Sequence, residues 1–90
     1  MNQSEMLMAL KTDLGITASV YDTRLTQLLT IARSEIEAEG ANLNPSASMC
    51  DGNLIVMYAA WLWRRRDTMI AMPRMLRWQL NNRIFGVKAR

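Results

Sequence analysis

The side chains best suited to acid–base or metal chemistry are the carboxylates of Glu35 and Glu39, because the sequence contains no histidine. Histidine is the commonest general base and metal ligand. The two glutamates are four residues apart, so on a helix they share a face. A di-metal site would need a second helix with a Glu-x-x-His pair, which the sequence lacks. We interpret the pair as a solvated face and expect no metal site and no cofactor.

The single cysteine, Cys50, has no histidine to activate it as a nucleophile. A lone thiol cannot form an internal disulfide, and it suits a reducing compartment. The four glycines stand singly, at positions 15, 40, 52 and 86, so they form no glycine-rich phosphate loop. The sequence therefore predicts a protein without catalytic residues or enzymatic activity.

The residues best suited to binding a partner lie in the C-terminal part of the chain. Residues 1–53 carry three basic and seven acidic residues, a net charge of −4, whereas residues 54–90 carry eight basic residues and one acid, a net charge of +7. Such asymmetry suits a surface for nucleic acid, or complementary faces that attract when copies meet head to tail. The candidate contacts are Trp63, Arg64, Arg65, Arg66, Arg74, Arg77, Trp78 and Asn81.

Two interpretations of the arginines remain open. The consecutive arginines at positions 64–66 fan outward at ~100° intervals on a helix, and they also suit the negative end of its dipole. Arg74, Arg77 and Asn81 share one helical face. That face is either solvated or a grip for phosphates or for a partner's carboxylates.

The tryptophans and methionines belong either to the core or to an interface with a partner. We expect Trp61 in the core, because it lies within an apolar run. Trp63 and Trp78 lie off the expected core stripes, so one of them is expected to anchor a subunit contact. The eight methionines fit core filling better than an adaptable docking surface.

The elements that position these residues are predicted to be helices, beginning with two in the N-terminal half. Apolar spacing indicates a first helix over residues 3–13, and Gly15 stands where a helix commonly stops. Ser19 and Asp22 have the spacing of a capping box, so a second helix is predicted to begin there and to end at Gly40. Its predicted buried stripe is Leu25, Leu28, Leu29, Ala32 and Ile36.

The third predicted helix follows a loop at residues 41–48. Ser48 or Asp51 caps it, and it extends over about residues 51–67. We expect it to be central, because residues 54–63 form an apolar run with almost no polar face.

The fourth predicted helix begins near Pro73, which suits a first helical turn, and ends at Gly86. One stripe along it is formed by Leu76, Leu80 and Arg83 or Ile84. No stretch alternates with the period of a strand. The sequence therefore predicts an all-α fold, a single-domain bundle of about four helices over residues 1–90.

Membrane association is not expected. The apolar run at residues 54–63 is about half of the ~20 residues needed to cross a bilayer. Residues 1–14 lack the basic start and continuous apolar run of a secretory signal. We therefore expect a soluble intracellular protein.

The most distinctive motifs of the chain are MYAAWLWRRRD at residues 57–67 and MPRMLRWQLNNRIF at residues 72–85. These two C-terminal motifs resemble the head-to-tail connector (head completion) proteins of long-tailed bacteriophages. The less specific stretches LTQLL at residues 25–29 and IEAEG at residues 36–40, with Asp51, occur in the same order. The resemblance covers most of the chain, and its specific part is the C-terminal pair.

The resemblance implies a non-enzymatic virion protein at the head–tail junction, made in the bacterial host cytoplasm or encoded by a prophage. It implies a ring homo-oligomer, dodecameric in the virion, that binds the phage portal protein, extends the DNA channel and meets head-closure or tail proteins. Non-specific contact with packaged DNA is also implied. The alternative from the charge pattern is a small DNA-binding regulatory protein that uses its basic C-terminal half.

Overall fold

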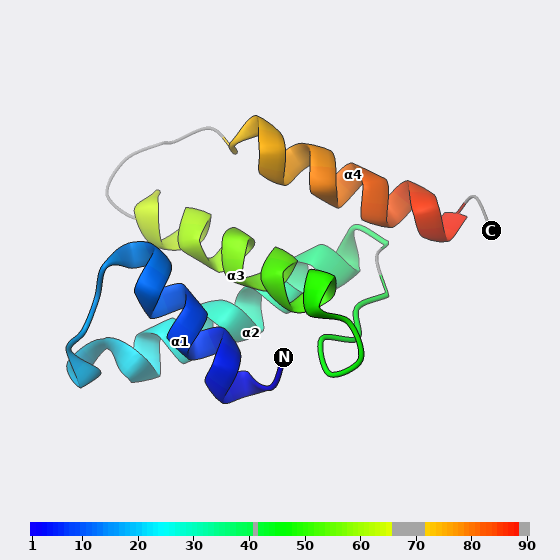
Figure 1. The fold of residues 1–90 in the computed structure, drawn as a ribbon. Helices are drawn as coiled ribbons and strands as arrows, with labels where there is room; N and C mark the ends of the chain where they lie inside the picture. The colour runs from blue at the N-terminus through cyan, green and yellow to red at the C-terminus, as the bar shows by residue number, and fades with distance from the viewer. Residues whose placement is uncertain (41, 66–71, 89–90) are drawn as a thin grey trace.

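The computed structural model describes residues 1–40, 42–65 and 72–88, and within these ranges it is all-helical (Figure 1). The described residues form α1 (Gln3–Leu14), α2 (Asp22–Ala38), α3 (Met49–Arg64) and α4 (Arg74–Lys88), with a short 3₁₀ turn, η1 (Ser19–Tyr21), before α2. No strand occurs in these ranges. The predicted all-α fold class with about four helices is confirmed.

Helix α3 packs against each of the other three α-helices, most extensively against α2 and then α1. Its side chains from Leu54 to Leu62 are mostly buried, because the apolar run of the sequence leaves it few polar positions. The predicted stripe of α2 is buried in full, and α4 buries Leu76, Leu80 and Ile84. Each fully buried leucine or isoleucine stabilises the fold by about 1.5–3 kcal/mol relative to exposure.

The start of α1 carries a cap that the sequence analysis missed. The Asn2 side chain accepts a hydrogen bond from the Glu5 N–H at 2.8 Å, and the Glu5 carboxylate accepts one from the Asn2 N–H at 3.0 Å. This is a capping box with asparagine in the first position. At the other end the predicted stop is confirmed, since Gly15 adopts a left-handed conformation with φ 70°.

The capping box predicted at Ser19 is wrong. Residues Ser19–Tyr21 form the 3₁₀ turn, and α2 begins at Asp22 without a side-chain cap. The Asp22 carboxylate lies 2.8 Å from the Lys11 ammonium group instead. A short aspartate that pairs with the preceding helix is not free to reach back to the backbone N–H of Ser19, which explains the difference.

The predicted cap at Ser48 is confirmed, whereas the end of α3 and both ends of α4 differ from the prediction. Ser48 caps α3, accepting a hydrogen bond from the Asp51 N–H at 3.3 Å, and α3 ends at Arg64 rather than near residue 67. Pro73 precedes α4 instead of lying in its first turn, and its carbonyl accepts from the Arg77 N–H at 3.0 Å. Helix α4 continues through Gly86, because one glycine inside a helix costs only ~1 kcal/mol.

Candidate functional site

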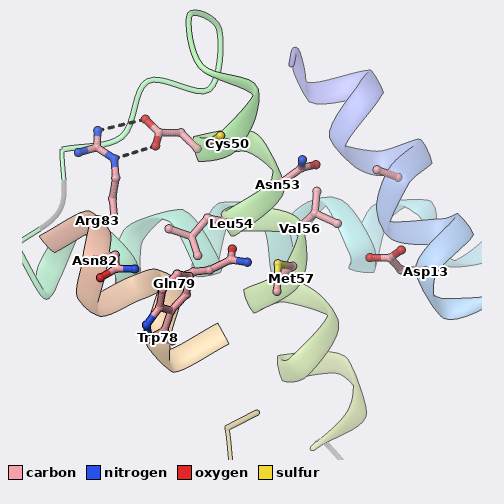
Figure 2. A pocket seen from close by; sticks show the side chains of 12 residues that line it. Asp13, Cys50, Asn53, Leu54, Val56, Met57, Trp78, Gln79, Asn82 and Arg83 are labelled. Carbon is pink, nitrogen blue, oxygen red and sulfur yellow. Dashed lines mark hydrogen bonds and ion pairs between the residues drawn. The ribbon is translucent and has the colours of Figure 1, made fainter. Parts of the chain in front are cut away.

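A groove runs along the exposed side of α3, between α1 and α4 (Figure 2). We call it the α3 groove and define it by the residues that line two adjoining hollows of about 680 and 240 Å³. Both hollows include Asp13 and Met57. The larger hollow is lined by Ala9, Asp13, Cys50, Asp51, Asn53, Leu54, Val56, Met57, Trp78, Gln79, Asn82 and Arg83. The smaller is lined by Asp13, Met57, Ala60, Trp61, Arg64, Pro73, Met75 and Leu76.

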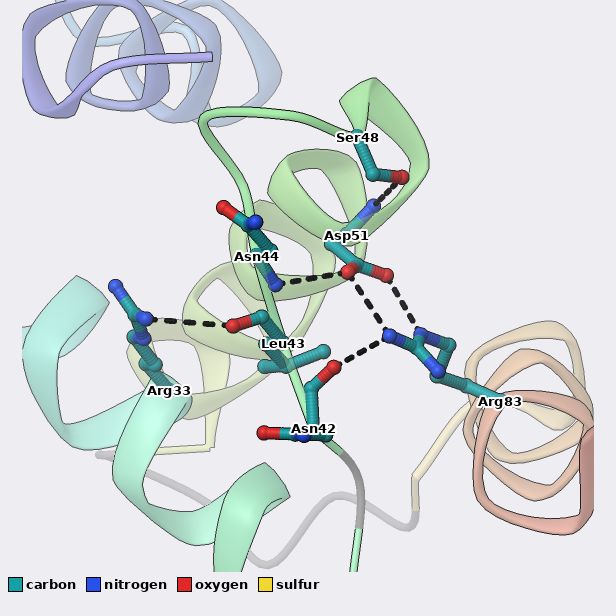
Figure 3. Close-up of polar contacts among 7 residues, drawn as sticks. All are labelled: Arg33, Asn42, Leu43, Asn44, Ser48, Asp51 and Arg83. Atoms are coloured by element: carbon teal, nitrogen blue, oxygen red, sulfur yellow. Dashed lines mark hydrogen bonds and ion pairs between the residues drawn. The ribbon is translucent and has the colours of Figure 1, made fainter. Parts of the chain in front are cut away.

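The α4 wall of the groove is fixed by an ion pair between Asp51 and Arg83 (Figure 3). Asp51 is only 3% exposed. Its carboxylate oxygens accept from Arg83 Nε at 2.8 Å and Nη2 at 3.2 Å, and one of them accepts from the Asn44 N–H at 2.9 Å. Arg83 also donates to the Asn42 carbonyl. The arrangement ties α4 to the start of α3 and to the loop that precedes it.

The environment of Asp51 keeps its carboxylate charged at neutral pH. The hydrogen bond from Arg83 lowers the pKa of Asp51 most, and the Asn44 N–H lowers it further. Burial of the carboxylate acts in the opposite direction, but the net pKa lies below the ordinary value. The same pairing raises the pKa of Arg83. The sequence analysis missed this pair, although it named Arg83 or Ile84 as the continuation of the stripe of Leu76 and Leu80.

The predicted face of Arg74, Arg77 and Asn81 is occupied in part by contacts within the chain. Arg77 Nη2 lies 2.9 Å from Glu39 Oε1 at the end of α2, and Arg77 Nε and Nη2 donate to Asn81 Oδ1 at 3.3 and 3.2 Å. Arg77 and Asn81 are half-buried, whereas Arg74 is exposed. Arg74 is therefore the member of the trio best placed to meet a partner.

The tryptophans differ in exposure. Trp78 is 62% exposed on the α4 wall of the groove. Trp63 is half-buried, with its ring edge-to-face to Tyr21 at 5.7 Å between centroids. Trp61, expected in the core, is only half-buried at the core edge, because it lies on the side of α3 that faces the groove. Of the two tryptophans proposed as anchors, Trp78 offers the larger surface.

The arginines after the apolar run lie at one end of the groove. Arg64 donates to the Asp13 carbonyl at 3.3 Å and lines the smaller hollow. The Arg65 guanidinium stacks on Trp61, 4.4 Å from the ring centroid. Both are exposed at the end of α3, where cations also interact favourably with the helix dipole. Arg66 lies outside the residues that the structure describes.

The glutamates weighed as a catalytic pair each have a separate contact. Glu35 hydrogen-bonds to buried Tyr58, whose pKa is raised to about 12 by burial first and by this hydrogen bond second. Glu39 pairs with Arg77. Within the described ranges no three His, Cys, Asp or Glu residues are grouped to hold a metal ion. No helix there is both long enough and apolar enough to cross a membrane.

The lining of the groove combines apolar side chains with polar ones. Its polar groups include the amides of Asn53, Gln79 and Asn82 and the exposed carboxylate of Asp13. The thiol of Cys50 is exposed, and the carboxylate nearest to it in sequence, that of Asp51, is held by Arg83. Comparison with protein-family models, curated proteins and solved structures finds no match for the chain.

Proposed function

We propose that the chain is a structural subunit of a phage head-to-tail connector, which assembles as a ring under the portal and joins head to tail. The observation that carries the proposal is where its two C-terminal motifs lie. Ala60, Trp61 and Arg64 of the first motif line the smaller hollow of the groove, together with Pro73, Met75 and Leu76 of the second. Stretches separated in the sequence thus form one surface, as expected of a shared binding region.

The distribution of exposed charge supports assembly from identical copies. Ring formation requires a heterologous interface, in which two different faces of the subunit meet. Exposed acids on α1 and α2 that do not line the groove include Glu5 and Glu37. Exposed bases at the end of α3 and the start of α4 are Arg64, Arg65 and Arg74. Opposite charges on different faces attract successive copies and set their orientation.

The partners proposed for the ring are the portal protein above it and head-closure or tail proteins below it, at the head–tail junction of the virion. A ring of this kind extends the channel through which packaged DNA passes. Exposed arginines on its inner wall would contact DNA phosphates without reading the base sequence. The proposed role needs no cofactor and no catalysis.

The test measures the solution mass of the purified chain by size exclusion with light scattering, over a concentration series and at two salt concentrations, with and without the portal protein. A discrete oligomer of many copies, alone or on the portal, is the expected result. Salt should weaken it, because exposed charges are screened. A monomer or dimer under all of these conditions would overturn the proposal.

A matched pair of variants tests the residue assignment. Arg74→Glu reverses an exposed charge at the proposed contact and is expected to abolish incorporation into heads while leaving helix content unchanged. Arg24→Glu is the control, because Arg24 is exposed on α2 and, among the described residues, its hydrogen bond is to Gln27 on the same helix at 3.3 Å. Arg77 is a poorer choice, since its reversal would also break the pair with Glu39. Infectious particles from Arg74→Glu would refute the role of Arg74.

A DNA-binding regulator is the second candidate, favoured by the three exposed arginines at the end of the groove. Against it, Arg77 and Arg83 are held in ion pairs, which leaves Arg74 as the exposed arginine in the described part of α4. Specific binding to duplex DNA, with an affinity that falls steeply as salt rises, would favour this candidate. A large oligomer without such binding would favour the connector.

A further inference from the structure

Helix α3 has neighbours on three sides and an open fourth side, which is the floor of the α3 groove. Cys50, Asn53 and Met57 are spaced by three and four residues, so they lie in one stripe along that side. Trp61 and Arg64 continue the stripe into the smaller hollow. The floor therefore extends along most of α3, with α1 on one side and α4 on the other (Figure 2).

The α4 side of the groove has exposed apolar side chains at helical spacing. Met75 is 60% exposed and Trp78 is 62% exposed, and both line the groove. They are three residues apart, so they project from neighbouring positions on one face of α4. An exposed tryptophan side chain that a partner covers often contributes a large share of the binding free energy.

The two ends of the groove differ in charge. Arg64 lines the end that lies near the C-terminus of α3, where Asp13 supplies the opposing charge among the groove residues. Arg65 stacks on Trp61 of the same hollow, and exposed Arg74 lies in the chain between Pro73 and Met75, which line it. At the other end the charges of Asp51 and Arg83 neutralise each other, and the remaining polar groups are amides and the Cys50 thiol. A partner that matches the groove is therefore apolar along its length and acidic at one end.

We propose that the α3 groove binds an amphipathic helix of another protein, whose apolar side packs on Met57 and Trp78 and whose acidic end meets the arginines. A trough between two helices, floored by a third, is the geometry in which proteins commonly bind such helices. The proposal deepens the proposed function, since a connector must hold proteins other than itself. Peptide binding and ring formation are measured separately, so either can fail alone.

A second copy of the chain is a poorer occupant, because its exposed apolar side chains have the wrong arrangement. Among the described residues outside the groove, Met8, Ile31 and Met49 are exposed singly on three different helices. Val20 and Tyr21 lie in the 3₁₀ turn, which is too short to fill a trough. None of these offers two apolar side chains three or four residues apart on one helical face.

The test uses two synthetic helical peptides with the same leucine-rich apolar side, one with three glutamates at one end and one with three lysines there. Isothermal titration calorimetry of the full chain is expected to show one-to-one binding of the glutamate peptide, with a dissociation constant in the roughly micromolar range. The lysine peptide should bind about tenfold more weakly or worse, and added salt should reduce that difference.

Three variants, each checked for unchanged helix content, locate the binding site. Trp78→Ala should weaken binding of the glutamate peptide about tenfold or more. Met49→Ala is the matched control, because Met49 is 68% exposed but does not line the groove, and it should bind like the unaltered chain. Reversal of Arg64 and Arg74 to glutamate together should shift the preference to the lysine peptide.

Four results would overturn the proposal. The first is that neither peptide binds at concentrations up to about 1 mM, which corresponds to negligible affinity. The second is that both peptides bind equally well, and the third is that Trp78→Ala leaves binding of the glutamate peptide unchanged. The fourth is that the chain self-associates and that Trp78→Ala abolishes this self-association. The last result would identify a second copy as the occupant of the groove.

Discussion

Replacement of Asp51 by asparagine tests the polar contact that ties α4 to the rest of the fold. The change keeps the size of the side chain and an oxygen that accepts from the Asn44 N–H. It removes the charge that faces Arg83 and places an amide N–H₂ group near a guanidinium, so two donors meet. Asp51 is 3% exposed, and therefore water cannot replace the lost interaction.

The expected loss of stability follows from the burial of the pair. Breaking a fully buried ion pair by removing one partner costs about 3–5 kcal/mol. The Arg83 side chain is 30% exposed and keeps its bond to the Asn42 carbonyl, so the charge left behind is partly solvated. We therefore expect a loss of about 2–3 kcal/mol, which lowers the melting temperature of a domain of this size by roughly 10–20 °C.

The matched control is Glu37→Gln, which makes the same change of carboxylate to amide in an exposed pair. Glu37 Oε2 lies 3.7 Å from Arg33 Nε, and both side chains are more than a third exposed. Such a pair contributes about 0.3 kcal/mol. Urea unfolding followed by circular dichroism measures both variants at neutral pH. A cost for Asp51→Asn within about 0.5 kcal/mol of the control would refute the reasoning, since typical surface changes fall in that range.

The pH dependence gives a second check with a defined sign. The pKa of Asp51 in the folded state lies below its unfolded value of about 3.9, chiefly because Arg83 donates hydrogen bonds to it. The folded state thus binds fewer protons there, so its contribution to stability is present above about pH 4 and is lost as the pH falls further. The difference between the unaltered chain and Asp51→Asn should narrow on acidification. A constant difference down to about pH 2 would contradict the pKa shift.

Three further outcomes are expected. Leu80→Ala should cost about 2–5 kcal/mol in urea unfolding, because Leu80 is fully buried between α4 and the core. Gly15→Ala should cost about 1 kcal/mol, because residue 15 has a φ of 70°, which a Cβ disfavours, and no atom lies near enough to clash. Absorbance titration should show a tyrosine with a pKa of about 12 that Tyr58→Phe removes, and the contribution of Tyr58 to stability should be lost as the pH rises from about 10 to 12.

The helices were predictable because burial follows simple periodicity. The stripe of α2 and the leucines of α4 recur every three or four residues, and this spacing places them on one face whatever the neighbours are. Helix ends were less predictable, because they depend on competition between local partners. Asp22 pairs with Lys11 rather than capping its own helix, and Gly86 does not stop α4.

The groove and the Asp51–Arg83 pair were not predictable from spacing alone, because each joins residues far apart in the sequence. The pair spans 32 positions, and no periodic pattern connects its members. A weaker signal was present, since Asp51 precedes an apolar run and Arg83 or Ile84 continues the stripe of Leu76 and Leu80. A charge beside the core needs a partner, so two opposite charges next to apolar positions of one small domain are candidates for an ion pair.

The position of Trp78 depends on these polar contacts as much as on the leucines of α4. Burial of Leu76 and Leu80 attaches α4 to α3, but apolar packing is non-directional and tolerates rotation of a helix about its axis. Arg77 and Arg83 are six residues apart, about 9 Å along the helix, and they pair with different segments, at the end of α2 and at the start of α3. These two ion pairs fix the rotation of α4 about its own axis. At that rotation Trp78 faces the groove.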